Sequence, residues 1–129
     1  MTTAVVCTAL LGLLVFGLGF AVSATRGATG VNIGYTSDPT DRLYKLVRAH
    51  GNATEYVPMM AVLIVLVGMH QPSAWMRWTF IAATVVRYCH AAGMILSPTL
   101  DKPYPLRFIG AVGTYIVGFA LVIATLSIA

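Results

Sequence analysis

Charged residues are scarce in this sequence. Asp, Glu, Lys and Arg make up 9% of its 129 residues, whereas a soluble domain carries roughly 25%. Hydrophobic residues make up 58% of the chain. So little charge excludes a protein whose whole surface faces water, and the length allows a single domain. The sequence therefore predicts an integral membrane protein.

Metal-ligand clusters and basic runs are also missing. The only cysteines, Cys7 and Cys89, lie within apolar stretches, which favours small buried side chains with free thiols over a disulfide or a metal site. The formal net charge is +4, but the Lys and Arg residues are spread along the chain. Nucleic acid is therefore not an expected partner, and no metal cofactor is expected.

Four apolar runs dominate what is present. A membrane-spanning helix needs about 20 mostly apolar residues, and four stretches qualify: 3–24, 39–69, 74–96 and 106–128. Because lipid cannot satisfy backbone hydrogen bonds, these runs must be helical. The expected fold is an all-α bundle of four transmembrane helices forming one domain, 1–129. Asp38 is predicted to cap the second helix, with Pro39 at its first position.

Lysine and arginine residues lie mainly beside the first and third connections. Arg26, Arg42, Lys45, Lys102 and Arg107 are near these connections, whereas only Arg77 lies beside the second. Such residues accumulate on the cytoplasmic side of membranes. We therefore expect the loops at 25–38 and 97–105 to be cytoplasmic, with both termini outside.

Polar residues recur inside the apolar runs. At 100° per residue, Arg48, Asn52 and Glu55 share one narrow face of the second run, and Arg87 and His90 share a face of the third. A charge near the bilayer centre costs about 2.5–3.5 kcal/mol even on the mildest scale, so such a gathering predicts a binding site. One alternative is a structural ion pair between Glu55 and Arg87. The candidate site residues, which lie in the last three runs or just after the first, are Arg26, Arg48, Asn52, Glu55, Arg87, His90 and Arg107.

Several cations beside one carboxylate and one amide favour a ligand with more than one negative charge and one positive charge. Arg48 and Glu55 are about 10 Å apart along a helix axis, and an extended tripeptide has a similar length at about 3.5 Å per residue. Glutathione has two carboxylates, an ammonium and a thiol, and fits this description. A phosphate-bearing lipid headgroup would leave Glu55 unexplained.

Small residues on the fourth run serve helix packing in our interpretation. Gly110, Thr114 and Gly118 are spaced four apart, and such stripes let helix backbones approach closely in membranes. His50 points away from the polar face of the second run.

The second run also resembles a known signature. Arg48-x3-Asn52-x2-Glu55-Tyr56-x-Pro58 is similar to the motif of the MAPEG family, the membrane-associated proteins of eicosanoid and glutathione metabolism. The resemblance extends to Arg87-x2-His90 and to Arg107, and covers the whole chain in length and span count. It implies a homotrimer of four-helix subunits with glutathione, or another small thiol, bound between neighbours.

The resemblance further implies a role for each residue. Arg107 would stabilise the thiolate as the catalytic group, while the thiol peptide would be held by Arg26, Arg48, Asn52, Glu55, Arg87 and His90. The implied activity is that of a transferase or peroxidase acting on lipophilic electrophiles or lipid hydroperoxides. A non-catalytic binding protein for a lipid or thiol and a small accessory subunit of a membrane complex remain alternatives.

Three positions depart from the specialised eicosanoid synthases. Gly51 stands where some of them carry an arginine, Met94 replaces a tyrosine, and Phe108 replaces a serine. These departures argue against the specialised prostaglandin and leukotriene activities, and leave the general detoxifying branch of the family or a protein without activity.

Overall fold

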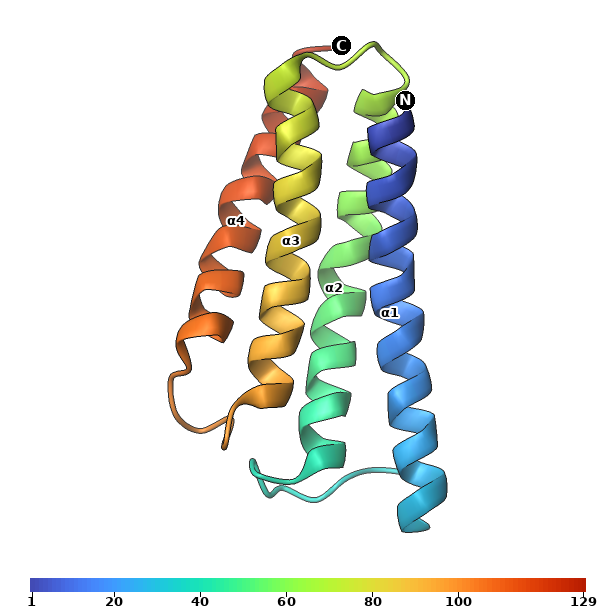
Figure 1. Ribbon diagram of the computed structural model, residues 1–129, viewed down its shortest axis with the longest axis vertical. Helices are drawn as coiled ribbons and strands as arrows, with labels where there is room; N and C mark the ends of the chain where they lie inside the picture. The colour runs from blue at the N-terminus through green and yellow to red at the C-terminus, as the bar shows by residue number, and fades with distance from the viewer.

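The computed structural model describes residues 1–129 and consists of four helices joined by three connections (Figure 1). α1 spans Thr2–Thr29, α2 spans Arg42–Gly68, α3 spans Ala74–Leu96 and α4 spans Pro105–Leu126. Each helix is long and apolar enough to cross a membrane. The two termini lie at the same end of the bundle (Figure 1). The prediction of an all-α, four-helix membrane bundle is confirmed.

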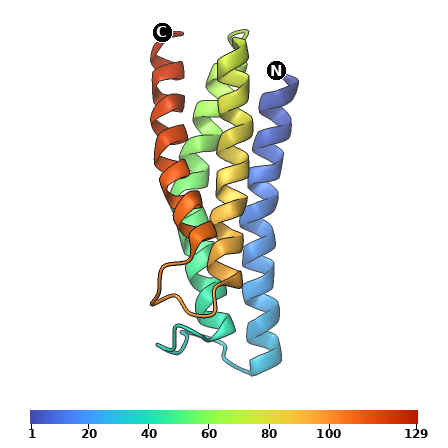
Figure 2. The ribbon, with the colours of Figure 1, turned by 60° about the vertical axis from the view of Figure 1, so that its left-hand side comes forward.

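The start of α2 differs from the prediction. Asp41, not Asp38, is its N-cap, and its carboxylate accepts a hydrogen bond of 2.8 Å from the Tyr44 amide. Pro39 stays outside the helix, where its carbonyl accepts a hydrogen bond from the Leu100 amide at 3.1 Å. That bond ties together the two connections that lie side by side at the lower end (Figure 2).

Asp38 instead closes a local turn. Its carboxylate accepts hydrogen bonds from the Thr40 amide and hydroxyl at 2.8 and 2.7 Å. Both bonds hold the pKa of Asp38 below its ordinary value, and the bond from the Thr40 hydroxyl has the larger effect. The N-cap of α2 therefore lies three residues beyond the predicted one.

α1 continues beyond its predicted end at residue 24. It stops at Thr29 because Gly30 adopts a left-handed conformation, with φ 73°, and returns its amide to the Arg26 carbonyl. A glycine at this position avoids the cost that a Cβ would impose. The long connection therefore comprises residues 30–41 rather than 25–38.

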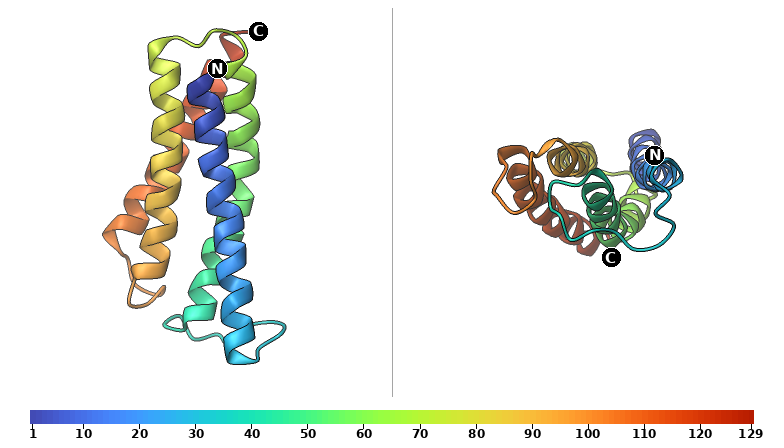
Figure 3. Two further views of the ribbon diagram at one scale, coloured as in Figure 1. Left: turned by 45° about the vertical axis from the view of Figure 1, so that its right-hand side comes forward. Right: turned by 90° about the horizontal axis from the view of Figure 1, so that it is seen from below.

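The helices form an open arrangement rather than a closed ring. α3 packs against all three other helices, whereas α1 and α4 do not contact each other. The view from below shows α1 and α4 on opposite sides (Figure 3). On the face between α2 and α4, Met59, Tyr115 and Phe119 are exposed, so this face is uncovered in the single chain.

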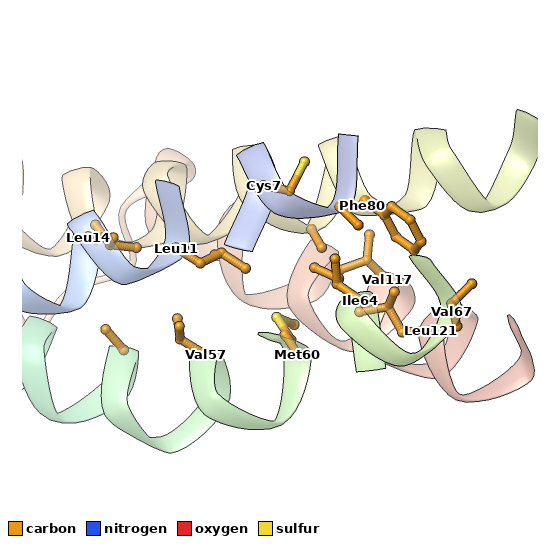
Figure 4. Packing of buried hydrophobic residues seen from close by; sticks show 14 of the residues in the cluster. Cys7, Leu11, Leu14, Val57, Met60, Ile64, Val67, Phe80, Val117 and Leu121 are labelled. Carbon is orange, nitrogen blue, oxygen red and sulfur yellow. The ribbon is translucent and has the colours of Figure 1, made fainter. Parts of the chain in front are cut away.

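Apolar side chains fill the interior and also cover the outside. Leu11, Ile64, Phe80 and Leu121 are fully buried in the core (Figure 4), while Phe16 on α1 is 81% exposed. Other apolar side chains on the outer faces of α1 and α4 are exposed as well. Such a surface fits a lipid environment, because soluble proteins rarely expose so large an apolar area.

Glycines let α3 and α4 approach unusually closely. A Cβ at Gly110 would lie 2.5 Å from the His90 backbone, and one at Gly93 would collide with the backbone of Arg107. Gly110 and Thr114 are buried here, as predicted for a packing face. Gly118 departs from this interpretation, because nothing lies within 4 Å of its added Cβ.

Candidate functional site: a groove between α2 and α4

An open groove runs between α2 and α4, and α3 contributes to its wall in two of its three parts. It begins with a cavity of about 530 Å³ near the α3–α4 connection, narrows to a pocket of about 30 Å³, and widens into a hollow of about 330 Å³. His90 and Ala111 line both the cavity and the pocket. Tyr56, Thr114 and Tyr115 line both the pocket and the hollow. The three spaces are therefore parts of one groove.

The two ends of this groove differ in chemistry. The cavity, which we call the cationic end, is walled by Arg48 from α2, His90 from α3 and Arg107 from α4. The hollow, which we call the apolar end, has Glu55 as its only charged residue, and most of its wall is hydrophobic: Met59, Met60, Leu63, Phe119 and Val122. A ligand along the groove would pass from cations to hydrocarbon.

Arg87 lies at the narrow point and is 1% exposed. Its guanidinium donates to the Asn52 side-chain oxygen at 2.7 Å, to the Asn52 carbonyl at 3.2 Å and to the Thr114 hydroxyl at 3.1 Å. Its carbon Cζ lies 5.2 Å from the centre of the Tyr56 ring, a cation–π distance. The Nε–H group has no protein acceptor. Arg87 thus links α2, α3 and α4 through one buried charge.

The predicted stripe on α2 faces this groove. Arg48 lines the cationic end, Asn52 the pocket and Glu55 the apolar end. Arg48 and Glu55 are exposed in the single chain. Asn52 turns its oxygen to Arg87, which leaves its NH₂ group free to donate to a ligand.

His90 and Arg107 are held in fixed orientations by backbone carbonyls. His90 Nδ1 lies 3.0 Å from the Arg107 carbonyl oxygen; because a carbonyl only accepts, Nδ1 carries the proton and Nε2 is the acceptor in the neutral ring. The Arg107 guanidinium donates to the carbonyls of Leu100 and Lys102 at 3.0 and 2.9 Å. Its remaining N–H groups are available to a ligand in the cavity.

A tyrosine pair spans the groove where the pocket meets the apolar end. The hydroxyls of Tyr56 on α2 and Tyr115 on α4 are 3.2 Å apart, and their rings meet edge to face at 6.1 Å. Sequence reasoning missed Tyr115. The available signal was a hydroxyl-bearing aromatic in the middle of an otherwise apolar run, directly after Thr114.

Comparison with known protein families shows which family this chain belongs to. The sequence profile of the MAPEG family matches residues 4–127, nearly the whole chain. The chain belongs to the MAPEG family. A search of curated proteins gives no match. Family membership makes this a multi-pass membrane protein of the kind that serves glutathione and eicosanoid metabolism.

Arg26 lies apart from the other candidate residues of this MAPEG chain. It sits near the end of α1, where its guanidinium donates to the carbonyls of Val31 at 3.1 Å and Gly34 at 2.8 Å. It lines none of the three spaces of the groove. Because α1 and α4 do not touch, Arg26 does not join Arg107 within one subunit.

The alternative of an ion pair between Glu55 and Arg87 is not observed within the MAPEG subunit. The hydrogen bonds of Arg87 go to Asn52 and Thr114. Glu55 is exposed and makes no hydrogen bond to another residue of the chain through its side chain. Its position at the groove therefore has no explanation in the packing of a single subunit.

The three departures noted in the sequence lie in or beside the groove. Met94 and Phe108 line the cationic end, so an apolar side chain stands at each position. An added Cβ at Gly51 would meet nothing within 4 Å. No group of three or more His, Cys, Asp or Glu side chains in this MAPEG protein is arranged to hold a metal ion.

Proposed function

We propose that this protein is a glutathione-dependent transferase or peroxidase that acts on lipophilic electrophiles or lipid hydroperoxides. The observation that supports this most directly is the groove, which joins a cationic cavity to an apolar hollow. A reaction between a hydrophilic thiol and an apolar substrate needs a site that binds both next to each other. Glutathione is the thiol that we propose, and another small anionic thiol would use the same groups.

Binding of the thiol peptide rests on the α2 stripe. Arg48 would pair with a carboxylate, the Asn52 NH₂ would donate to a peptide carbonyl, and Glu55 would pair with the ammonium. Glu55 makes no side-chain hydrogen bond in the chain, so it can serve a ligand without breaking the fold. An extended tripeptide of about 10 Å matches the axial separation of Arg48 and Glu55.

Arg107 is the proposed catalytic residue. A thiol has an ordinary pKa near 8.5, and only the thiolate attacks an electrophile efficiently. A guanidinium beside the sulfur favours the anion, and lowering its pKa by two units corresponds to about 2.7 kcal/mol. The carbonyls of Leu100 and Lys102 hold this guanidinium at the cavity wall. His90 Nε2 would accept a hydrogen bond from the incoming thiol.

The complete site would be shared between copies of the chain. Within one subunit Arg26 lies away from the groove, on a helix that does not contact α4. The α1 of a second copy, laid over the uncovered face, would bring its Arg26 to the cationic end. We therefore propose that each groove is completed by a neighbouring copy, in the homotrimer that the family resemblance implies.

The apolar end of the groove would receive the second substrate from the lipid. Its wall belongs to helices whose outer faces are apolar, so a hydrophobic electrophile need not cross water. We further propose that the cationic end faces the cytoplasm, with both termini outside, as the distribution of lysine and arginine indicates.

Thiolate formation tests this function. On addition of glutathione to the protein in detergent, we expect the ultraviolet absorbance band of a thiolate at a pH where free glutathione is mostly protonated. Arg107→Ala should abolish the band, whereas Arg77→Ala, at the far end of the bundle, should retain it. If wild type binds glutathione without forming the band, the protein is a binding protein and not a thiol transferase.

A further inference from the structure

One hydroxyl hydrogen of the Tyr56–Tyr115 pair has no hydrogen-bond acceptor in the protein. Each phenol carries a single O–H donor, and the two hydroxyls contact only each other, at 3.2 Å. One of them donates, so the other must direct its hydrogen away from the pair. Inside a membrane an unused donor is costly, which points to a ligand acceptor.

The surroundings decide which tyrosine holds the free hydrogen. The Arg87 guanidinium lies against the Tyr56 ring at 5.2 Å and withdraws electron density, which makes the Tyr56 hydroxyl the better donor and the poorer acceptor. Either hydroxyl could donate by geometry alone, and this contact favours Tyr56 as the donor to Tyr115. As the acceptor, the Tyr115 hydroxyl becomes polarised and a stronger donor, and Tyr115 is 55% exposed.

The position of this hydroxyl matches one class of ligand. Tyr115 lines both the polar pocket and the apolar hollow. Around it, Met59, Leu63 and Phe119 offer only hydrocarbon contacts. A ligand held here would be apolar along most of its length and would carry an oxygen acceptor at the level of the tyrosine pair.

We propose that Tyr115 is a specificity-determining residue whose hydroxyl donates to the oxygen of a lipophilic substrate, such as an epoxide or a hydroperoxide. It selects oxygen-bearing apolar molecules over hydrocarbons of the same shape. Tyr56 and Arg87 act as positioning residues: Tyr56 through its hydrogen bond to the Tyr115 hydroxyl, and Arg87 through its contact with the Tyr56 ring.

The chemical consequence rests on the proposed transferase function. When a thiolate attacks an epoxide carbon, a sulfur–carbon bond forms and a carbon–oxygen bond breaks. The released electron pair on oxygen takes the proton of the Tyr115 hydroxyl. The proton lost by the thiol when it became a thiolate then restores the phenol. The sum is addition of the thiol across the epoxide, with no other reactant.

Binding can be tested without catalysis. We would measure the affinity of 9,10-epoxyoctadecane and of 9-octadecene for the protein in lipid nanodiscs, in the absence of any thiol, and subtract partition into empty nanodiscs. Wild type should prefer the epoxide by about tenfold, the value of one net hydrogen bond. Tyr115→Phe should bind both molecules equally.

Three further variants make the assignment specific. Tyr56→Phe should keep part of the preference, because the Tyr115 hydroxyl remains. The double variant, with phenylalanine at both positions, should behave as Tyr115→Phe alone. Tyr35→Phe removes a phenol that lies in the α1–α2 connection, outside the groove, and should retain the full preference.

The outcomes separate this inference from the proposed function. Equal binding of the two molecules by wild type, or a preference that survives in the double variant, overturns the role of Tyr115. A preference that Tyr115→Phe removes, in a protein that forms no thiolate, supports Tyr115 while the transferase function fails. With an active enzyme, Tyr115→Phe should lower turnover of the epoxide about tenfold.

Discussion

Arg87 on α3 donates to both the side-chain oxygen and the backbone carbonyl of Asn52 on α2, at 2.7 and 3.2 Å. A guanidinium with 1% exposure and no carboxylate partner depends on such neutral acceptors for its stability. The same contact aligns the amide of Asn52 with the groove. One interaction therefore holds the bundle together and shapes the candidate site.

This contact predicts a difference between two residues on the same face of α2. Asn52→Ala should lower the free energy of unfolding by about 1.5–3 kcal/mol, because a buried charge loses its best acceptor. Arg48→Ala should change it by less than about 0.5 kcal/mol, since Arg48 is exposed. Denaturation in mixed detergent micelles measures both. Equal stability of the two variants would contradict the structural role of Asn52.

A second prediction concerns the close packing of α3 and α4. Gly110→Ala should destabilise the protein by about 1–3 kcal/mol, because the added methyl group meets the His90 backbone at 2.5 Å. Gly118→Ala on the same helix is the control, with nothing within 4 Å of its added Cβ. Thermal unfolding in detergent, followed by circular dichroism, compares the two. A stable Gly110→Ala protein would mean that the helices can separate without cost.

A third prediction addresses the ammonium of the thiol peptide. Glu55→Gln should weaken glutathione binding about tenfold, corresponding to about 1.4 kcal/mol, and should leave unfolding unchanged because Glu55 is exposed. Calorimetry with glutathione and with N-acetylglutathione, which lacks the ammonium, completes the cycle. Wild type should discriminate between the two ligands and Glu55→Gln should not. If both proteins discriminate equally, Glu55 does not contact the ammonium.

A fourth prediction concerns the sharing of sites between copies. Arg26→Ala and Arg107→Ala should each inactivate the enzyme when expressed alone. In a random mixture, about a quarter of the sites would combine an intact groove from one variant with an intact α1 from the other. Co-expression should therefore restore roughly that share of wild-type turnover. If turnover stays at the level of the single variants, both arginines act in a site formed by one subunit.

The orientation in the membrane is a fifth prediction. After replacement of Cys7 and Cys89 by serine, single cysteines at Ser37 and Gln71 would probe opposite ends of the bundle. In intact cells a membrane-impermeant maleimide should label the cysteine at position 71 and not the one at position 37. The reverse pattern would place the cationic end of the groove outside the cell.

The sequence by itself determined the class of fold, the four spans and the polar face of α2. These follow from local properties: hydropathy sets the spans, and helical periodicity sets which residues share a face. Arg48, Asn52, Arg87, His90 and Arg107 were expected near one another, and the structure brings them to one groove. The family signature followed from the same local pattern.

Only the tertiary structure decided which groups meet. The Arg87 guanidinium donates hydrogen bonds to Asn52 and Thr114 and does not pair with Glu55. Arg26 lies away from the groove, and Tyr115 contacts Tyr56, which comes 59 positions earlier in the sequence. Periodicity fixes the direction of a side chain on its own helix, but the rotation and depth of one helix against another depend on packing. Here that packing is set by the close approach of α3 and α4 at their glycines.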